Sequence, residues 1–405
     1  MKTLRYTERN DDHTPEVEVP LSKSVANRWQ IVKALFPDKI LKNQLSEARD
    51  TRILREALAS DEEDINLHDA GTAMRFATAY FSVQKGRNVY LHGTDRMHKR
   101  PIEPLVSALR SLGAEISYDQ EIGYPPLRIY GKKLRGGQVH IPADMSSQFI
   151  SALMLVAPAT NDGLLIHRTS KSVSQPYVNM TADVLRQAGI TVEEDGMRIH
   201  VHGSPAKQVQ MPTEGDWSAA ATFVSWTAIS GAPLRIKGLA KHSIQGDKVL
   251  IDWIEQLGIE AEWEKDVWSI RRTHIPEEDL VLDMLDYPDL APSIVMAAFG
   301  QGRSGKVTGL QTLRIKETDR ISALVRTIER MGGDTTDLSS SLYWAPAPKL
   351  DFSGEPFDTF DDHRMAMAIA PMAFFGELKL NDASVVEKSF PGYWKQMELA
   401  GLHLS

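Results

Sequence analysis

Residues 146–158 read SSQFISALMLVAP, a short polar cluster followed by an apolar run. The run from Phe149 to Pro158 contains almost no charge, which predicts a helix that is apolar nearly all round and therefore buried. Unpaired N–H groups and the helix dipole make a helix N-terminus attractive to anions. This stretch therefore predicts a buried helix whose polar first turn can bind an anionic ligand.

The same arrangement occurs six times along the chain. The intervals are 47, 75, 71, 74 and 72 residues when counted from Ser24, Gly71, Ser146, Trp217, Ala291 and His363. A nearly fixed period predicts one supersecondary unit that is copied along the chain. The polar clusters at the six helix starts are Ser22-Lys23-Ser24, Ala70-Gly71-Thr72, Ser146-Ser147-Gln148, Glu214-Gly215-Asp216, Pro288-Asp289 and Asp362-His363-Arg364.

A second series of helices repeats in the same register. Each of these helices is amphipathic and ends at a glycine, the residue that most easily stops a helix: Gly113, Gly189, Gly258, Gly332 and Gly401. A short β-rich run lies between the two helices of each unit, which predicts α/β layers. These runs are residues 39–42, 88–92, 163–167, 233–237, 306–310 and 378–380.

The repeat also predicts how the chain is divided. A chain of 405 residues is long for a single core, and six units divide into three and three. We expect an N-terminal globule over residues 20–213 and a C-terminal globule formed by residues 1–19 together with 214–405. The first unit is about 25 residues shorter than the others, and the deficit falls between Asp50 and Asp69.

Composition excludes several classes of function. A net charge of −8 argues against nucleic acid or an anionic membrane as a partner. No apolar stretch reaches the roughly 18 residues of a spanning helix, and no signal-peptide core is found, so we expect a cytoplasmic protein. The chain has no cysteine and its histidines lack metal-ligand spacing, so we expect no metal site.

Seven cations lie in or beside the helix-start clusters or in short polar loops of this acidic chain. Such residues suit binding of carboxylate or phosphate groups, although any one of them could instead belong to a solvated charged face. Asp289 and Glu317 lie among them, either as structural ion-pair partners or as an acid and a base. The seven cations are Lys23, Arg28, Arg100, Lys316, Arg320, Arg364 and Lys388.

Nine short runs of this sequence resemble the EPSP synthase (3-phosphoshikimate 1-carboxyvinyltransferase) family. They lie between about residue 20 and Trp394 and occur in the same order as in the family. The resemblance implies a two-globule inside-out α/β barrel of six βαβαββ repeats, with buried inner helices, a truncated first repeat and an active site in the cleft between the globules. The nine runs are residues 22–28, 70–75, 96–102, 146–149, 174–177, 214–216, 245–247, 316–320 and 362–367.

The resemblance implies transfer of the enolpyruvyl group of phosphoenolpyruvate to the 5-hydroxyl of shikimate 3-phosphate. It implies Asp289 as the base, Lys23 as its assistant and Glu317 as the acid, with no cofactor. Phosphoenolpyruvate would be held by Lys23, Gly71, Arg100, Gln148, Arg320, Arg364 and Lys388. Shikimate 3-phosphate would be held by Lys23, Ser24, Arg28, Ser146, Ser147, Gln148, Ser174, Tyr177, Asp289 and Lys316.

Some positions depart from the family pattern, and two alternative functions follow from the same fold. Leu21, Asp69, Phe76 and Thr312 stand where the family usually has other residues.

One alternative function is that of the related enolpyruvyltransferase acting on UDP-N-acetylglucosamine, and another is that of a non-catalytic binding protein. We expect a monomer with the two small-molecule substrates as its partners.

Overall fold

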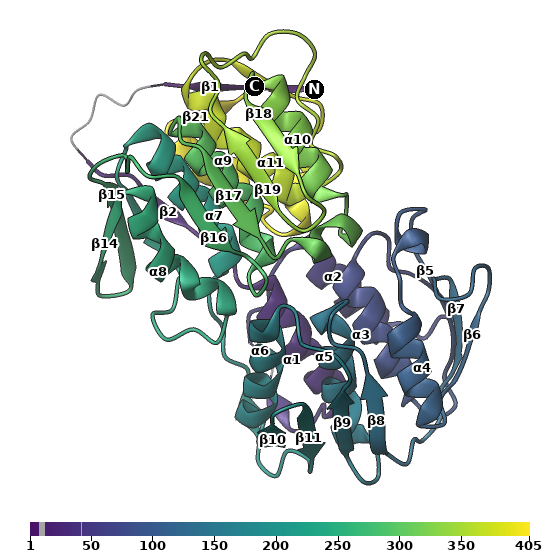
Figure 1. Cartoon of the computed structure of the whole chain (residues 1–405). Helices are drawn as coiled ribbons and strands as arrows, with labels where there is room; N and C mark the ends of the chain where they lie inside the picture. Colours follow the sequence, from purple (N-terminus) through teal and green to yellow (C-terminus); the bar gives the residue numbers. More distant parts are fainter. Residues whose placement is uncertain (8–12, 42) are drawn as a thin grey trace. The chain divides into compact units, whose positions relative to one another are not determined.

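The structure is a computed structural model that describes residues 1–7, 13–41 and 43–405 (Figure 1). The chain folds as two units, called here the N-terminal unit (residues 23–213) and the C-terminal unit (residues 1–22 and 214–405). Residues 8–12, and residue 42 at the end of the first expected strand, lie outside the described residues.

The N-terminal unit contains helices and strands in alternation. Its helices are α1 (Lys23–Leu35), α2 (Arg49–Ala59), α3 (Gly71–Ser82), α4 (Glu103–Ser111), α5 (Ser147–Val156) and α6 (Gln175–Gln187). Its strands are β3 (Ile40–Leu41), β4 (Asp64–Asn66), β5 (Asn88–His92), β6 (Glu115–Tyr118), β7 (Leu127–Tyr130), β8 (Gly137–Ile141), β9 (Leu164–Arg168), β10 (Thr191–Asp195), β11 (Arg198–His202) and β12 (Val209–Gln210).

The C-terminal unit has the same alternation and includes both ends of the chain. Its helices are α7 (Trp217–Ser230), α8 (Leu250–Trp253), α9 (Ala291–Gly300), α10 (Arg320–Arg330), α11 (His363–Ile369) and α12 (Tyr393–Leu399). Its strands are β1 (Lys2–Tyr6), β2 (Glu16–Glu18), β13 (Leu234–Lys237), β14 (Ile259–Glu264), β15 (Val267–Arg272), β16 (Leu280–Asp283), β17 (Gly305–Thr308), β18 (Asp334–Asp337), β19 (Leu342–Ala345), β20 (Leu378–Leu380) and β21 (Leu402–Leu404).

The predicted helix starts are confirmed. The helices α1, α3, α5, α7 and α11 begin in or directly after their polar clusters, and α9 begins after a 3-10 turn over Pro288–Leu290 that contains its cluster. In α5, every residue except Gln148 is buried, as its apolar sequence predicts. Two of these apolar helices end in a 3-10 turn: α5 ends at Val156 and continues as a 3-10 helix over Ala157–Ala159, and α11 ends at Ile369 and continues as one over Ala370–Phe374. Pro371 has no N–H group and cannot continue an α-helical hydrogen-bond ladder.

The second series of helices also ends where the glycines predict. Gly189 follows α6 with a φ of 80°, and Gly258 follows a short 3-10 turn with a φ of 67°. Both lie in the left-handed region, which glycine adopts without a steric penalty. In α10, Ile321, Leu324 and Ile328 are buried while Arg326 and Glu329 are exposed, so the helix is amphipathic as expected, although its first residue, Arg320, is buried.

Four sheets of the described chain have four strands each and one common order. In each sheet the first two strands are parallel and the other two pairs are antiparallel. The orders are β4-β5-β7-β6, β8-β9-β11-β10, β2-β13-β15-β14 and β16-β17-β19-β18. One supersecondary arrangement is therefore formed by four separate stretches of sequence.

Two smaller sheets are completed by segments far away in the sequence. In the shortened part of the N-terminal unit, β3 pairs in parallel with β12 and no antiparallel pair is attached to it in the described residues. In the C-terminal unit, β1 lies between β20 and β21 and pairs antiparallel with both. The first strand of the chain therefore joins two of its last strands into one sheet.

The helices that begin at the polar clusters pack against one another inside each unit. Helix α3 packs on α5 in the N-terminal unit, and α9 packs on α7 and α11 in the C-terminal unit. No helix of the described residues is long and apolar enough to cross a membrane. Because these neighbouring helices all begin with a polar cluster, each unit gathers polar groups at its helix starts.

The central position of β1 leads to a test of stability. Leu4 is fully buried and is paired in register with Leu378 and Leu404. Leu4→Ala should lower the free energy of unfolding by about 2–5 kcal/mol, because it leaves a cavity in the core. Arg5→Ala is the control, since its ion pair with Glu377 is exposed and such pairs contribute about 1 kcal/mol or less.

Urea unfolding followed by tryptophan fluorescence measures both variants, because seven of the eight tryptophans belong to the C-terminal unit and only Trp29 does not. Equal losses in the two variants would contradict the assignment of Leu4 to the core.

Candidate functional site

Asp289 is the centre of an ion-pair cluster in the C-terminal unit. It lies in the turn just before α9, and its carboxylate accepts hydrogen bonds from Arg320 Nη1 (2.9 Å) and Arg364 Nη2 (3.0 Å). Lys316 Nζ lies 3.6 Å from the same carboxylate. Burial alone would raise the pKa of Asp289. The attraction of three nearby cations, Arg364, Lys316 and Arg320, is stronger than this effect and holds the pKa well below its ordinary value. Asp289 is therefore ionised at neutral pH.

Arg320 connects Asp289 to two further carboxylates. Its side chain is 1% exposed, and its Nε and Nη2 atoms donate to Asp362 at 2.7 and 3.2 Å. Nη2 also donates to Glu317 Oε2 at 2.9 Å, and Lys388 Nζ lies 3.8 Å from the other oxygen of Glu317. Burial alone would lower the pKa of Arg320, but the carboxylates of Asp362, Glu317 and Asp289 raise it instead. All six residues predicted for the site in this unit thus belong to one network.

Asp247 is a buried carboxylate beside this network. It is 3% exposed, and Ser218 Oγ donates a hydrogen bond to it. Burial raises the pKa of Asp247 to about 6; the nearby Arg364 works against this rise, while Asp289 adds to it. Such a pKa lets the group gain or lose a proton near neutral pH.

The N-terminal unit holds a buried cation among neutral groups. Arg28 of α1 is 3% exposed and donates to Thr181 Oγ1 (2.7 Å) and to the backbone oxygens of Ser24 (2.9 Å) and Tyr177 (3.0 Å). No carboxylate of the described residues lies within ion-pair distance of it, and burial lowers its pKa to about 10. Neutral oxygens alone balance this charge poorly, so the site favours an anionic ligand.

Arg100 is a second buried cation without an acidic partner among the described residues. It is 5% exposed, and its Nε has no hydrogen-bond partner. Its guanidinium lies against Gly71, the first residue of α3: a Cβ atom placed on Gly71 would lie 2.5 Å from both Nη atoms. A guanidinium beside the positive end of a helix makes a strong site for an anion.

Other predicted residues of this unit lie at its helix starts. Lys23 opens α1 and pairs with Asp50 of α2 at 3.1 Å. Ser146 caps α5 and accepts a hydrogen bond from the backbone N–H of Gln148, whose side chain donates to Thr72 at the start of α3 (3.1 Å). These contacts connect the first turns of neighbouring helices.

Two predicted serines are buried at helix starts. Ser147 is the first residue of α5. Ser174 precedes α6 with a φ of 52°, a left-handed conformation that is uncommon for serine and costs of order 1 kcal/mol or more. Strain of this kind is most often found at functional sites, which is consistent with the prediction for Ser174.

Sequence reasoning missed three carboxylates of these networks. Asp50 pairs with Lys23, Asp362 pairs with Arg320, and Asp247 lies near Arg364. Asp247 and Asp362 lie in short runs that carry the family resemblance, and this was an available signal. Asp50 lies in the shortened first unit and is preceded by no recognisable motif.

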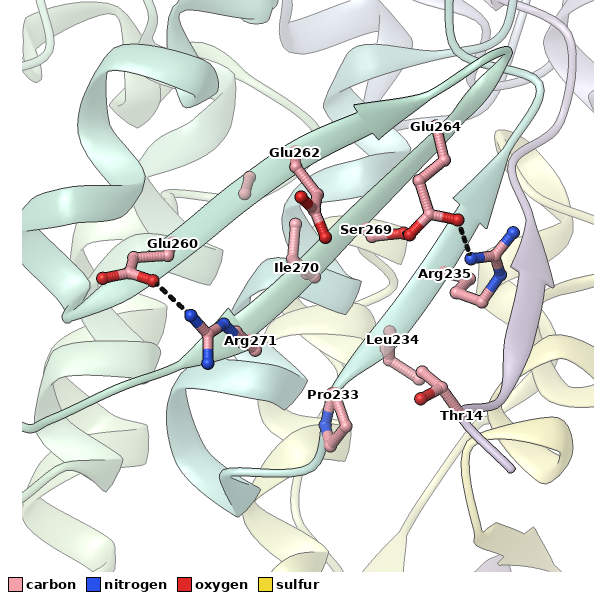
Figure 2. A pocket seen from close by; sticks show the side chains of 11 residues that line it. Thr14, Pro233, Leu234, Arg235, Glu260, Glu262, Glu264, Ser269, Ile270 and Arg271 are labelled. Atoms are coloured by element: carbon pink, nitrogen blue, oxygen red, sulfur yellow. Dashed lines mark hydrogen bonds and ion pairs between the residues drawn. The ribbon is translucent and has the colours of Figure 1, made fainter. Parts of the chain in front are cut away.

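A surface pocket of the C-terminal unit contains none of the predicted residues. It has a volume of about 310 Å³ and lies over β13, β14 and β15 (Figure 2). Its arginines are paired with its glutamates, Arg271 with Glu260 and Arg235 with Glu264. Exposed pairs of this kind are common on protein surfaces and do not by themselves indicate a ligand.

The raised pKa of Asp247 leads to a test by pH. The unfolded carboxyl has a pKa of about 3.9, so between pH 4 and pH 6 the folded state binds more protons and stability falls as pH rises. Asp247→Asn removes this loss. Urea unfolding gives the free energy of unfolding of the variant minus that of the wild type at each pH. This difference should increase by about 2–3 kcal/mol from pH 4 to pH 7.5. A difference that stays constant over this pH range would contradict the raised pKa.

The sequence of the chain matches one family of known proteins. The family model for EPSP synthase (3-phosphoshikimate 1-carboxyvinyltransferase) matches residues 16–397. A 3-phosphoshikimate 1-carboxyvinyltransferase of Bacteroides fragilis is 37% identical over 389 residues, covering 95% of each chain. A protein of the same name from Shewanella halifaxensis is 33% identical over 413 residues, covering 94% of this chain and 95% of its own.

A solved structure of EPSP synthase from Acinetobacter baumannii matches the fold with a TM-score of 0.73 at 21% identity, covering 100% of both chains. The α/β fold is therefore that of the EPSP synthase structures. On the evidence of a family model that spans nearly all of its length and of relatives above 30% identity, the chain belongs to the EPSP synthase (3-phosphoshikimate 1-carboxyvinyltransferase) family.

Proposed function

We propose that this protein is an enzyme that transfers the enolpyruvyl group of phosphoenolpyruvate to the 5-hydroxyl of shikimate 3-phosphate. The products are 5-enolpyruvylshikimate 3-phosphate and phosphate, in the shikimate pathway of aromatic amino acid biosynthesis. The family match and the names of the relatives support this reaction. The observation that carries it in the structure is the pair of buried guanidinium groups, Arg28 and Arg100, that have no carboxylate partner among the described residues.

The charge of the substrates matches such a site. Each substrate carries a carboxylate and a phosphate, so the two together bring roughly five to six negative charges. Arg28 and Arg100 carry positive charge that the described carboxylates do not neutralise, and a substrate anion would stabilise both. This complementarity favours small ligands with several negative charges over neutral ones.

We assign the binding residues as the family resemblance implies. Shikimate 3-phosphate contacts Lys23, Ser24, Arg28, Ser146, Ser147, Gln148, Ser174, Tyr177, Asp289 and Lys316. Phosphoenolpyruvate contacts Lys23, Gly71, Arg100, Gln148, Arg320, Arg364 and Lys388. Residues of both units therefore contribute to one active site in this proposal.

The catalytic step needs a proton acceptor and a proton donor. Asp289 removes the proton of the 5-hydroxyl with help from Lys23, while Glu317 protonates the methylene carbon of phosphoenolpyruvate. The alkoxide oxygen then bonds to the adjacent carbon to give a tetrahedral adduct. The adduct loses phosphate as the proton movements are reversed. In this proposal the pairing of Asp289 with three cations keeps it ionised, and substrate anions that share those cations would increase its basicity.

We also propose that the fold consists of six βαβαββ repeats arranged as a two-globule inside-out α/β barrel. The common order of four sheets supports the repeat. The parallel pair β3-β12 would be what remains of the truncated first repeat, which has lost its two antiparallel strands. In the last repeat, β1 would take the place of one antiparallel strand.

The two alternative functions are less well supported. The family match and the relatives' names do not favour the related enzyme that acts on UDP-N-acetylglucosamine. A binding protein without activity would be expected to lose its acid or base. Lys23, Asp289 and Glu317 are all present.

Phosphate release tests the proposed reaction directly. The wild type should release phosphate from phosphoenolpyruvate when shikimate 3-phosphate is present, and should not do so when UDP-N-acetylglucosamine replaces it. Asp289→Asn should lower kcat by at least about 100-fold, because the general base is lost. The exposed Glu277→Gln is a matched control and should keep full activity. Release that does not depend on shikimate 3-phosphate would refute the proposal.

Gly71 allows a test of the phosphoenolpyruvate site alone. Gly71→Ala places a methyl group 2.5 Å from Arg100 Nη1 and Nη2, so the guanidinium must move. The KM for phosphoenolpyruvate should rise by at least about tenfold, with a smaller change for shikimate 3-phosphate. Gly392→Ala is the control, because the nearest atom to its added Cβ is 3.9 Å away. Steady-state kinetics that show an unchanged KM for phosphoenolpyruvate would contradict the assignment of Arg100.

A further inference from the structure

The hairpin of β10 and β11 gathers three metal-ligating side chains on one face. His200 and His202 are alternate residues of β11, so both side chains lie on the same side of the sheet. Glu193 of β10 is paired in register with His200. The candidate ligand atoms of the three residues all lie within 4.8 Å of one another. The strand periodicity thus brings together a His-x-His pair and a carboxylate.

The distances in this cluster are close to those of a coordinated ion. Glu193 Oε2 lies 3.6 Å from His200 Nδ1, and Glu193 Oε1 lies 3.9 Å from His202 Nε2. Ligand atoms around a tetrahedral Zn²⁺ are roughly 3.3 Å apart, given bonds of about 2.0–2.2 Å. The two imidazole rings already lean together, with centroids 4.5 Å apart. Small side-chain rotations would therefore complete three bonds to one ion.

The surroundings of the cluster leave room for an ion and for water. The side chains of Glu193, His200 and His202 are 67%, 39% and 40% exposed. In the described part of the chain, the ion-pair partners of Glu193 are these two histidines and no lysine or arginine. Its carboxylate thus keeps a net charge available to a cation, and solvent can fill the remaining coordination positions.

The same face of the sheet carries other charged and titratable groups. His167 of β9 is paired in register with Arg198 of β11 and stacks on His140 of β8, with ring centroids 4.7 Å apart. Arg198 also faces Asp195 across the hairpin. The arginine repels a cation, which is therefore favoured farther from the turn of the hairpin, where Glu193 faces His200 and also approaches His202.

We propose that Glu193, His200 and His202 form a surface binding site for a divalent first-row transition-metal ion such as Zn²⁺. Two imidazole nitrogens and one carboxylate oxygen suit Zn²⁺, Ni²⁺ or Cu²⁺, whereas Mg²⁺ and Ca²⁺ prefer oxygen ligands alone. A bound ion links β10, the edge strand of its sheet, to β11. The site has no part in the proposed reaction, and it revises the expectation from sequence that the histidines lack ligand spacing.

Calorimetric titration of the full chain with ZnCl₂ in phosphate-free buffer at pH 7.5 tests this site. The wild type should bind one Zn²⁺ per chain at this cluster. His200→Ala and His202→Ala should each weaken that binding by at least about tenfold, and Glu193→Gln by several-fold. His167→Ala is the matched control, since it removes a histidine of the same sheet face and should leave the affinity unchanged. Glu193 is exposed and the three histidines are half-buried, and circular dichroism checks that each variant is folded.

Two further measurements make the result decisive. Thermal unfolding should show that Zn²⁺ raises the Tm of the wild type but not that of a His200→Ala, His202→Ala double variant. Binding should weaken at pH 5.5, because metal ligands must be deprotonated. Lack of binding by the wild type, equal binding by the double variant, or an equal loss in His167→Ala would each overturn the assignment. All of these readouts are independent of enzyme activity.

Discussion

The buried guanidinium of Arg320 organises the polar centre of the C-terminal unit. It bonds to Asp289, Glu317 and Asp362, which come from the turn before α9, the loop before α10 and the start of α11. Charges buried in this way are stable only while they are paired, and removal of one partner leaves the others uncompensated. The orientation of these helix starts therefore depends on one side chain, and Lys316, Arg364 and Lys388 are placed around the same carboxylates.

The two units bury positive charge in different ways. The cations predicted for the site in the C-terminal unit, Lys316, Arg320, Arg364 and Lys388, are paired with carboxylates of the same unit, so their charge is largely neutralised before any ligand binds. In the N-terminal unit, Arg28 is held by neutral oxygens and Arg100 lies against the start of α3. Burying these charges without a carboxylate is unfavourable in the folded protein, and an anion that binds there offsets this unfavourable free energy. Folding stability and ligand affinity are in this way coupled through the same arginines.

The parts of this structure that sequence predicted are those with a local signal. A polar cluster before an apolar run marks a helix start, and a glycine after an amphipathic run marks a helix end, so α5 and the end of α6 could be placed to within about two residues. Partners distant in sequence carry no such signal. The pairing of Lys23 with Asp50, of β3 with β12 and of His200 with Glu193 depends on how elements are brought together, which a pattern in one segment does not contain.

The place of β1 has a consequence for how the protein is made. Residues 2–6 are translated long before their two neighbours in the sheet, residues 378–380 and 402–404. The entire N-terminal unit, residues 23–213, is translated in between and has all of its own strand partners within that span. A nascent chain therefore carries an unpaired β1 until residues 378–404 have been translated, when a contact of very long sequence separation completes the sheet. An unpaired strand edge is prone to aggregation, so β1 is vulnerable throughout that interval.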